Sequence, residues 1–294
     1  MTLQLRIIHF FQDHATNFTN TLAELITILG EEYVLIGILA FIYFVYNKQA
    51  GERIAYSVFL SLCLNNAVKG LVRAPRPEIV DPTIIPVRAE TATGYSFPSG
   101  HTQTAAAFYT SVGFVFKKKK LWIAIGILIF LIGLSRVVLR VHFPIDVIVG
   151  ALLGIGCALL GSLLYAKVEN SKRHKFLLLG ITAVVFLPFM FLYMRPTYED
   201  MEIYRDFYTG YALFLGFIPA VYIENTFVGF DCSSKLSIRI IRFVIAMILL
   251  LGIQMGLKLV FPQQSIFFDM LRYFLVSFVG LGLYPLTFKY LKLR

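Results

Sequence analysis

Residues 121–166 read LWIAIGILIFLIGLSRVVLRVHFPIDVIVGALLGIGCALLGSLLYA. Two apolar runs, 121–140 and 145–166, flank the short connection VHFP, and Asp146 follows at the start of the second run. A helix needs roughly 17 to 25 apolar residues to cross about 30 Å of hydrocarbon. Each run therefore has the length of a membrane-spanning helix, and the connection between them is expected at one membrane surface.

The same pattern recurs along the whole chain of 294 residues. Its composition of 58% hydrophobic and 15% charged residues, with a mean hydropathy of +0.74, exceeds what a soluble core can bury. We predict an all-α, polytopic membrane protein with nine candidate spans. Besides the two runs already quoted, the candidates lie near residues 25–46, 53–71, 101–116, 175–193, 210–228, 240–261 and 268–288.

The net charge of +10 is distributed among short loops and not gathered on one soluble face. It therefore indicates membrane topology, and we expect no nucleic acid partner. Most basic residues fall on one side of the predicted spans: Lys48, Arg53, Lys117 to Lys120, Lys167, Lys172, Arg173, Lys175, Lys235, Arg239, Arg242, Lys289, Lys292 and Arg294. By the positive-inside rule this side is cytoplasmic. The rule predicts a plasma (inner) membrane protein with its N-terminus outside and its C-terminus in the cytoplasm.

Loop lengths suggest the organisation of the chain. Two long loops, 73–99 and 195–209, are both expected on the outer side. We predict an N-terminal amphipathic, interfacial segment over 1–30, a six-helix core over 31–193, and about three accessory membrane helices over 194–294. The three cysteines have no short spacing between them, so neither a disulfide framework nor a zinc site is indicated.

The first of three polar clusters lies where the second predicted span ends. Lys69, Arg73 and Arg76 are spaced four and three residues apart, so a helix places them on one side. Pro75 and Pro77 stop the helix there. The cluster predicts a cationic wall, although basic side chains that extend from a helix end toward the membrane surface are the ordinary alternative.

The second cluster, Pro98-Ser99-Gly100-His101, stands just before an apolar run. Proline, serine and glycine suit a helix start, where free backbone N–H groups and the positive end of the helix dipole can bind phosphate. His101 then lies in the first turn, facing that anion. The alternative is a serine-capped helix with an incidental histidine.

The third cluster surrounds the connection VHFP. His142 and Asp146 are four residues apart, so the carboxylate can take the Nδ1 proton and leave a lone pair on Nε2. This is the arrangement of a nucleophile or general base in hydrolases, although structural His–Asp pairs are also common. No carboxylate cluster suited to Mg²⁺ accompanies these clusters, so we expect no metal and no cofactor.

Taken together, the three clusters resemble the type 2 phosphatidic acid phosphatase family, whose signatures are shared with vanadium haloperoxidases. Lys69 stands six residues before Arg76-Pro77, and Pro98-Ser99-Gly100-His101 follows. Ser135-Arg136 then stands five residues before His142, and Asp146 comes after three more. Haloperoxidases are not embedded in a membrane, so the apolar composition favours the lipid phosphatase branch.

The resemblance implies a role for each residue of these signatures. His142 is the implied nucleophile, Asp146 orients it, and His101 is the acid that protonates the leaving group. The implied phosphate-binding residues are Lys69, Arg76, Ser99, Gly100 and Arg136. Arg73 and Arg140 are candidates for additional contacts. Arg140 stands where the family often has glycine, and two readings remain open: a second phosphate contact, or a salt bridge to Glu78, Asp81 or Glu90.

The expected function is that of an integral membrane phosphatase that hydrolyses a lipid phosphate or diphosphate monoester through a phosphohistidine, without a metal. Undecaprenyl diphosphate, phosphatidylglycerophosphate and phosphatidic acid all fit. A lipid transporter or flippase, or a lipid phosphotransferase on the same core, stays open as an alternative. Gly150 and Gly154 form a small-residue pair that predicts close helix packing, within the core or in a homodimer.

Overall fold

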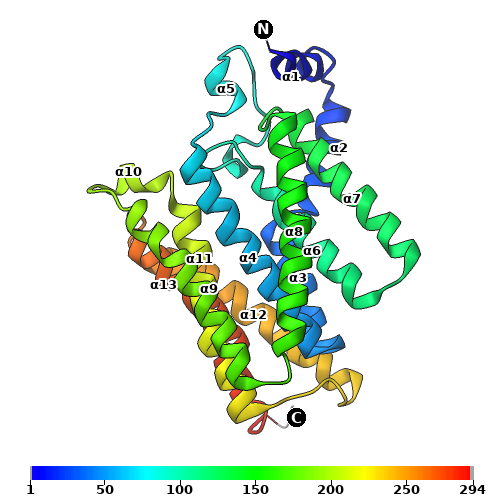
Figure 1. Ribbon diagram of the computed structural model, residues 1–294, viewed down its shortest axis with the longest axis vertical. Helices are drawn as coiled ribbons and strands as arrows, with labels where there is room; N and C mark the ends of the chain where they lie inside the picture. Colours follow the sequence, from blue (N-terminus) through cyan, green and yellow to red (C-terminus); the bar gives the residue numbers. More distant parts are fainter. Residues whose placement is uncertain (1, 292–294) are drawn as a thin grey trace. The chain divides into compact units, whose positions relative to one another are not determined.

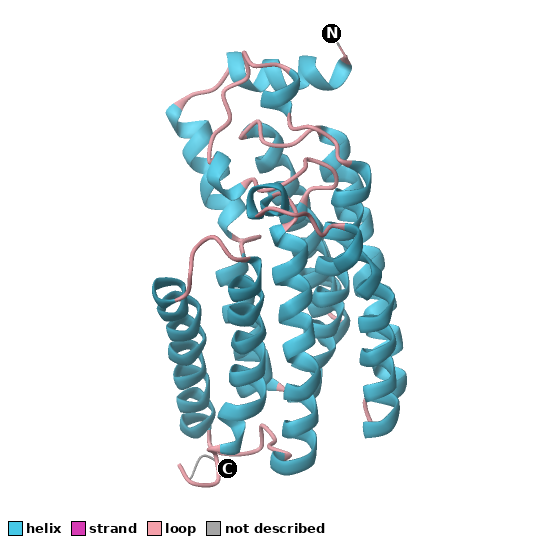
Figure 2. Ribbon diagram, turned by 90° about the vertical axis from the view of Figure 1, so that its left-hand side faces the viewer, coloured by secondary structure: helices cyan, strands magenta, loops and turns pink. Residues whose placement is uncertain are grey.

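The computed structural model describes residues 2–291, and every regular element in that range is helical (Figure 1, Figure 2). The all-α fold predicted from the sequence is confirmed. The α-helices are α1 (Leu3–Asp13), α2 (Asn17–Ile28), α3 (Glu32–Phe41), α4 (Lys48–Val72), α5 (Pro77–Val80), α6 (Gly100–Phe116), α7 (Lys119–Val138), α8 (Pro144–Val168), α9 (Lys172–Leu192), α10 (Tyr198–Glu202), α11 (Arg205–Ile223), α12 (Leu236–Val260), α13 (Ile266–Phe278) and α14 (Tyr284–Leu286). Shorter turns are η1 (Ile42–Tyr46), η2 (Ala89–Thr91), η3 (Glu224–Val228) and η4 (Val279–Leu283).

Within residues 2–291, eight helical stretches are long and apolar enough to cross a membrane, against nine predicted. The prediction over 101–116 is the one that differs. It forms α6, which has 17 residues and so extends only about 26 Å at 1.5 Å per residue. The helix ends at Phe116, where the predicted run also ended, and Lys117 after it adopts a left-handed conformation, with φ of 52°. The first span is also longer than predicted, running over Asn17–Tyr46.

Two compact units make up the described chain. The first, called here the first unit, contains the residues up to Leu35 together with Leu60–Leu160. The second, called here the extension unit, contains Ile36–Phe59 and the residues from Gly161 onward.

In the first unit, α6 packs against α7, and α2 packs against α7 as well. Gly150 and Gly154 on α8 permit a close approach to α6. A Cβ added at Gly150 would lie 2.8 Å from the carbonyl oxygen of Ser99, and one at Gly154 would overlap the carbonyl oxygen of Gln103. Both glycines therefore serve packing inside this unit, which accounts for the small-residue pair without a dimer contact. The N-terminal α1 buries Ile8 against Ile84 and Val137.

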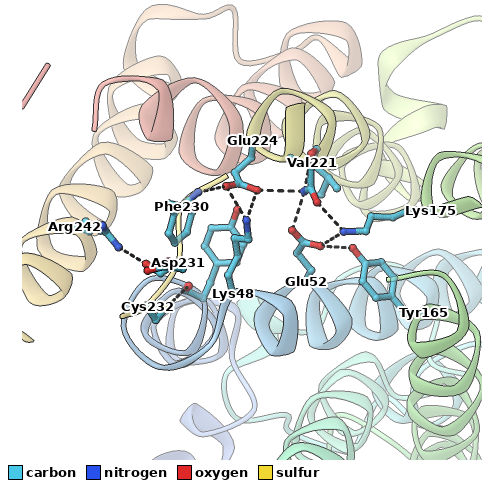
Figure 3. A network of polar contacts seen from close by, with 12 residues as sticks. Lys48, Glu52, Tyr165, Lys175, Val221, Glu224, Phe230, Asp231, Cys232 and Arg242 are labelled. Carbon is cyan, nitrogen blue, oxygen red and sulfur yellow. Dashed lines mark hydrogen bonds and ion pairs between the residues drawn. The ribbon is translucent and has the colours of Figure 1, made fainter. Parts of the chain in front are cut away.

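In the extension unit, α11 packs against α9 and α13 (Figure 1). A buried polar network connects α4, α8 and α9 with η3 (Figure 3). Glu52 accepts hydrogen bonds from Lys175 Nζ at 2.7 Å and from the Tyr165 hydroxyl at 2.6 Å. Lys48 Nζ lies 2.8 Å from a Glu224 carboxylate oxygen, and Asn225 donates to both glutamates. Each buried carboxylate thus has a cationic partner, as burial in a low dielectric requires.

Candidate active site

The connection between α7 and α8 carries His142, which is 2% exposed. Its Nδ1 lies 3.4 Å from Oδ2 of Asp146, on the first turn of α8. The same carboxylate oxygen accepts a hydrogen bond from the Phe143 backbone N–H at 2.9 Å and one from the Ser96 hydroxyl at 2.5 Å. Ser96 Oγ is also 3.4 Å from His142 Nδ1. Because Nδ1 faces the carboxylate and the hydroxyl, the other ring nitrogen, Nε2, is the one available for chemistry.

Two of the predicted phosphate-binding cations come from the end of α4 and the loop after it. Lys69 is 8% exposed, and its Nζ donates to the Thr93 carbonyl at 3.3 Å. Arg76 is 6% exposed and donates to the carbonyls of Gly94 at 3.0 Å, Thr93 at 2.6 Å and Val141 at 2.8 Å. Arg76 therefore ties the loop 93–95 to the backbone next to His142. Backbone carbonyl oxygens thus help to hold both cations in place.

Arg136, near the end of α7, is fully buried. Its Nη1 donates to the Thr27 hydroxyl at 3.0 Å and its Nη2 to the Thr91 hydroxyl at 3.3 Å. Its Nε is buried and has no hydrogen-bond partner. No ion pair among residues 2–291 includes Arg136, so its positive charge is compensated only at a distance. An arginine buried in this way favours the binding of an anion.

The signature Pro98-Ser99-Gly100-His101 begins α6, as its composition suggests. The backbone N–H of Ser99 donates to the Asp146 carbonyl at 3.0 Å, which ties the start of α6 to the start of α8. Nearby, Asn65 donates to the Gln103 side-chain oxygen at 2.8 Å. A Cβ on Gly100 would lie 3.4 Å from Asn65 Oδ1, an ordinary contact. His101 is half-buried in the first turn of this helix.

Charged side chains from several of these elements act on His142. Burial lowers the pKa of His142 well below its ordinary value, and the positive charges of Arg76, Arg136 and Lys69, with His101, lower this pKa further. All four neighbours are thus close enough to act on the imidazole. A lowered pKa keeps His142 neutral near pH 7, the state in which a ring nitrogen can attack phosphorus.

The two additional candidates lie differently from the rest. Arg73, directly after α4, is exposed, has a left-handed φ of 53°, and donates from Nε to the Gly70 carbonyl in the last turn of that helix. Arg140 is 4% exposed, with φ of 61°, and its Nε donates to the Ile85 carbonyl at 2.7 Å. Two of the acids considered as partners for Arg140 have other partners. Asp81 pairs with His9 at 2.9 Å, and Glu90 lies 3.8 Å from Arg88.

Several residues around the site carry no signal in the sequence. Ser96 stands just before the signature Pro98 to His101, and its hydroxyl donates a hydrogen bond to Asp146. Thr27 and Thr91 hold Arg136 from segments far away in the chain. Arg88 forms an ion pair of 2.8 Å with Glu31. Spacing within a motif predicts neighbours on one helix, but it contains no information about contacts across more than a hundred residues, such as that between Thr27 and Arg136.

A polytopic helical membrane protein that holds a His–Asp pair among buried cations, beside a helix start, has the parts that phosphoryl transfer requires. Its sequence agrees with this class. Residues 52–170 match the sequence profile described as "PAP2 superfamily", and residues 208–294 match the profile described as "PAP2 superfamily phosphatase, transmembrane extension". The chain belongs to the PAP2 superfamily and carries its transmembrane extension.

Characterised relatives match parts of the chain. A Bacillus subtilis protein named phosphatidylglycerophosphatase B is 33% identical over 121 residues, which cover 38% of this chain and 55% of that protein. A Sulfolobus acidocaldarius protein named undecaprenyl-diphosphatase is 33% identical over 141 residues, covering 46% of this chain and 65% of that one. Both matches span less than two thirds of the relative's length. A crystal structure of Aquifex aeolicus LpxE is 27% identical, covers 55% of this chain and 95% of its own, and has a TM-score of 0.49.

Proposed function

We propose that this protein is a membrane lipid phosphatase that hydrolyses a lipid phosphate or diphosphate monoester through a phosphohistidine on His142. The observation that carries the proposal is the buried excess of positive charge beside a neutral histidine. Lys69, Arg76 and Arg136 are each at least nine-tenths buried, while Asp146 is the carboxylate paired with His142. A phosphoryl group, with charge spread over its equatorial oxygens, is the ligand that balances such a site.

In the first step, Nε2 of His142 attacks phosphorus in line with the bond to the lipid oxygen. The N–P bond forms as the P–O bond breaks, and His101 gives its proton to the departing lipid oxygen. Asp146 stabilises the positive charge that develops on the imidazole through Nδ1. The cationic side chains and the backbone N–H groups at the start of α6 stabilise the equatorial oxygens.

In the second step, water attacks the phosphohistidine from the side that the lipid has left. His101, now neutral, takes a proton from this water while the N–P bond breaks. Inorganic phosphate leaves, and His142 returns to its neutral state. The cycle starts with the two histidines in opposite protonation states, His142 neutral and His101 protonated, and only His101 loses and regains a proton. The positive charge that holds the phosphoryl group comes from Lys69, Arg76 and Arg136. The proposed reaction therefore runs without a metal ion.

The substrate is proposed to be a lipid whose apolar chain stays in the bilayer while its phosphate enters the site. The names of the relatives support phosphatidylglycerophosphate and undecaprenyl diphosphate as first candidates.

The distribution of basic loops supports a site on the extracytoplasmic side, with the N-terminus outside and the C-terminus in the cytoplasm. Single cysteines placed at Thr83 and at Lys172, probed with a membrane-impermeant thiol reagent in whole cells and on a background without native cysteines, test this orientation. Labelling at Thr83 alone agrees with it, and labelling at Lys172 alone contradicts it.

The decisive experiment compares the purified wild type with His142→Ala in detergent and mixed lipid, with EDTA present throughout. Phosphate release is measured on phosphatidylglycerophosphate, undecaprenyl diphosphate and phosphatidic acid. His174→Ala is the matched control, because His174 is exposed and lies in the extension unit. Release by the wild type and by His174→Ala, but not by His142→Ala, is expected. Failure of the wild type to release phosphate from any of the lipids contradicts the hydrolase proposal and favours transport or phosphotransfer.

A further inference from the structure

Thr27, near the end of α2, makes a contact that the proposed chemistry does not yet use. Its hydroxyl accepts the hydrogen bond from Arg136 Nη1 at 3.0 Å, and both side chains are fully buried. The two residues are 109 positions apart in the sequence. α2 also lies outside residues 52–170, the segment that matches the PAP2 superfamily. The contact therefore joins the proposed phosphate-binding residue to a part of the chain without a recognised role.

The partners of Arg136 are hydroxyl groups, and this has an electrostatic consequence. Thr27 and Thr91 each accept one hydrogen bond from the guanidinium, which fixes the plane of the group. A carboxylate in either place would hold the arginine as well, but it would neutralise the charge that attracts an anion. With two hydroxyls the group is oriented and stays positive, and its buried Nε is left without a partner.

The end of α2 is itself held firmly within the first unit. A Cβ added to Gly30 would lie 3.0 Å from Ile132 on α7 and 3.5 Å from Ala105 on α6, so the turn after α2 sits tightly on both helices. The Tyr109 hydroxyl of α6 donates to the Leu29 carbonyl at 2.7 Å. Glu31, just beyond, pairs with Arg88 at 2.8 Å. The Thr27 hydroxyl is thus fixed by its backbone and can impose an orientation on Arg136.

We propose that Thr27 is a positioning residue of the phosphatase site, which orients the guanidinium of Arg136 toward the equatorial oxygens of the phosphoryl group. This inference rests on the proposed function and assigns α2 a part in the site. Thr27 acts through Arg136 and does not touch the phosphate. Loss of its hydroxyl leaves the charge of Arg136 in place but no longer fixes the direction of the guanidinium, and a misplaced group in an active site can cost about a hundredfold in rate.

The test uses Thr27→Val, which keeps the shape of the side chain and removes the hydroxyl, and Thr27→Ser, which restores the hydroxyl. Thr182→Val is the matched control, since Thr182 is also a buried threonine, but it lies on α9 in the extension unit. For each purified variant we measure kcat/KM for phosphate release, the inhibition constant of inorganic phosphate, and the unfolding temperature in detergent.

Thr27→Val is expected to lower kcat/KM by roughly tenfold to a hundredfold and to weaken inhibition by phosphate, while Thr27→Ser recovers most of both. Thr182→Val should change neither. In a double-mutant cycle, Thr27→Val should cause little further loss when Arg136 is already lysine, because the effect passes through the guanidinium. Equal loss in both backgrounds, or no loss in Thr27→Val alone, overturns the inference. A wild type that releases no phosphate overturns the proposed function first, so the two failures are distinguishable.

Discussion

The Ser96 hydroxyl donates a hydrogen bond of 2.5 Å to Oδ2 of Asp146, the same oxygen that faces Nδ1 of His142 at 3.4 Å. The carboxylate is thus held by a hydroxyl from the loop 73–99 and by the backbone N–H of Phe143. With its oxygen fixed at one point, Asp146 can select a single tautomer of the imidazole. A loop residue without a place in the signatures therefore takes part in orienting the proposed nucleophile.

Removal of the Asp146 charge is expected to lower kcat more than removal of the Ser96 hydroxyl. Asp146→Asn should lower kcat by roughly a hundredfold to ten-thousandfold, because the amide cannot stabilise the imidazolium and favours the wrong tautomer. Ser96→Ala should lower kcat by about tenfold, the effect of one lost hydrogen bond to a charged group. Steady-state phosphate release measures both. A Ser96→Ala variant as impaired as Asp146→Asn would show that the serine does more than hold the carboxylate.

The pH dependence of catalysis should reflect the lowered pKa of His142. Burial, with the charges of Arg76 and Arg136 next, moves this pKa below the ordinary 6.5, so the imidazole remains neutral and active as the pH falls past that value. The acid limb of kcat/KM should therefore have an apparent pKa below 6.5. Burial, with the charge of Arg136 next, also lowers the pKa of His101 well below its ordinary value, so loss of the His101 proton should give an alkaline limb at lower pH than an ordinary histidine would. Thermal unfolding over the same pH range separates titration from loss of structure. An acid limb at or above 6.5, or a monotonic profile, contradicts the assignment.

The close approach of α8 to α6 gives a prediction about stability. In Gly154→Ala the new methyl group overlaps the Gln103 carbonyl and lies 2.7 Å from Ala106, so the helices must separate. A loss of about 1 to 3 kcal/mol in the free energy of unfolding is expected from such overpacking. Gly156→Ala, on the same helix, meets nothing within 4 Å and should be neutral or slightly stabilising. Unfolding in detergent measures both, and equal effects would contradict this account of the packing.

The buried network of the extension unit predicts that the stability of the protein depends strongly on Glu52. Glu52→Ala leaves Lys175, which is 2% exposed, without its carboxylate, and should cost about 3 to 5 kcal/mol of stability. Glu199→Ala, at an exposed position, should change stability by less than about 0.5 kcal/mol.

A double replacement separates the loss of the ion pair from the loss of packing. Methionine at both Glu52 and Lys175 removes both charges together, so it should recover much of the stability lost in Glu52→Ala. Unfolding in detergent is again the measurement. If the double variant is as unstable as the single one, the unpaired charge is not the cause.

The order and type of the helices could be predicted from the sequence because hydrocarbon accepts little other than long apolar helices. The predicted run over 101–116 does form a helix, but α6 has 17 residues and is shorter than the eight membrane-spanning stretches. The left-handed Lys117 directly follows its last residue. The two long loops, 73–99 and 195–209, contain the short helices α5 and α10. Pro77 begins α5 and the Thr197 side chain caps α10, so each helix can start although few residues continue it.

The sequence by itself determined that the chain is helical and spans a membrane. It also determined that Lys69, the segment Pro98 to His101 and the segment Arg136 to Asp146 follow one another in the order of a known family. Those features follow from composition, periodicity and short spacing, which are local properties. The tertiary structure alone decided that Ser96 holds Asp146, that Thr27 and Thr91 hold Arg136, and that Arg76 ties loop 93–95 to the backbone at Val141. Such contacts depend on how distant helices pack, because a hydrogen bond forms only when two atoms lie within about 3.5 Å of each other, whatever their separation along the chain.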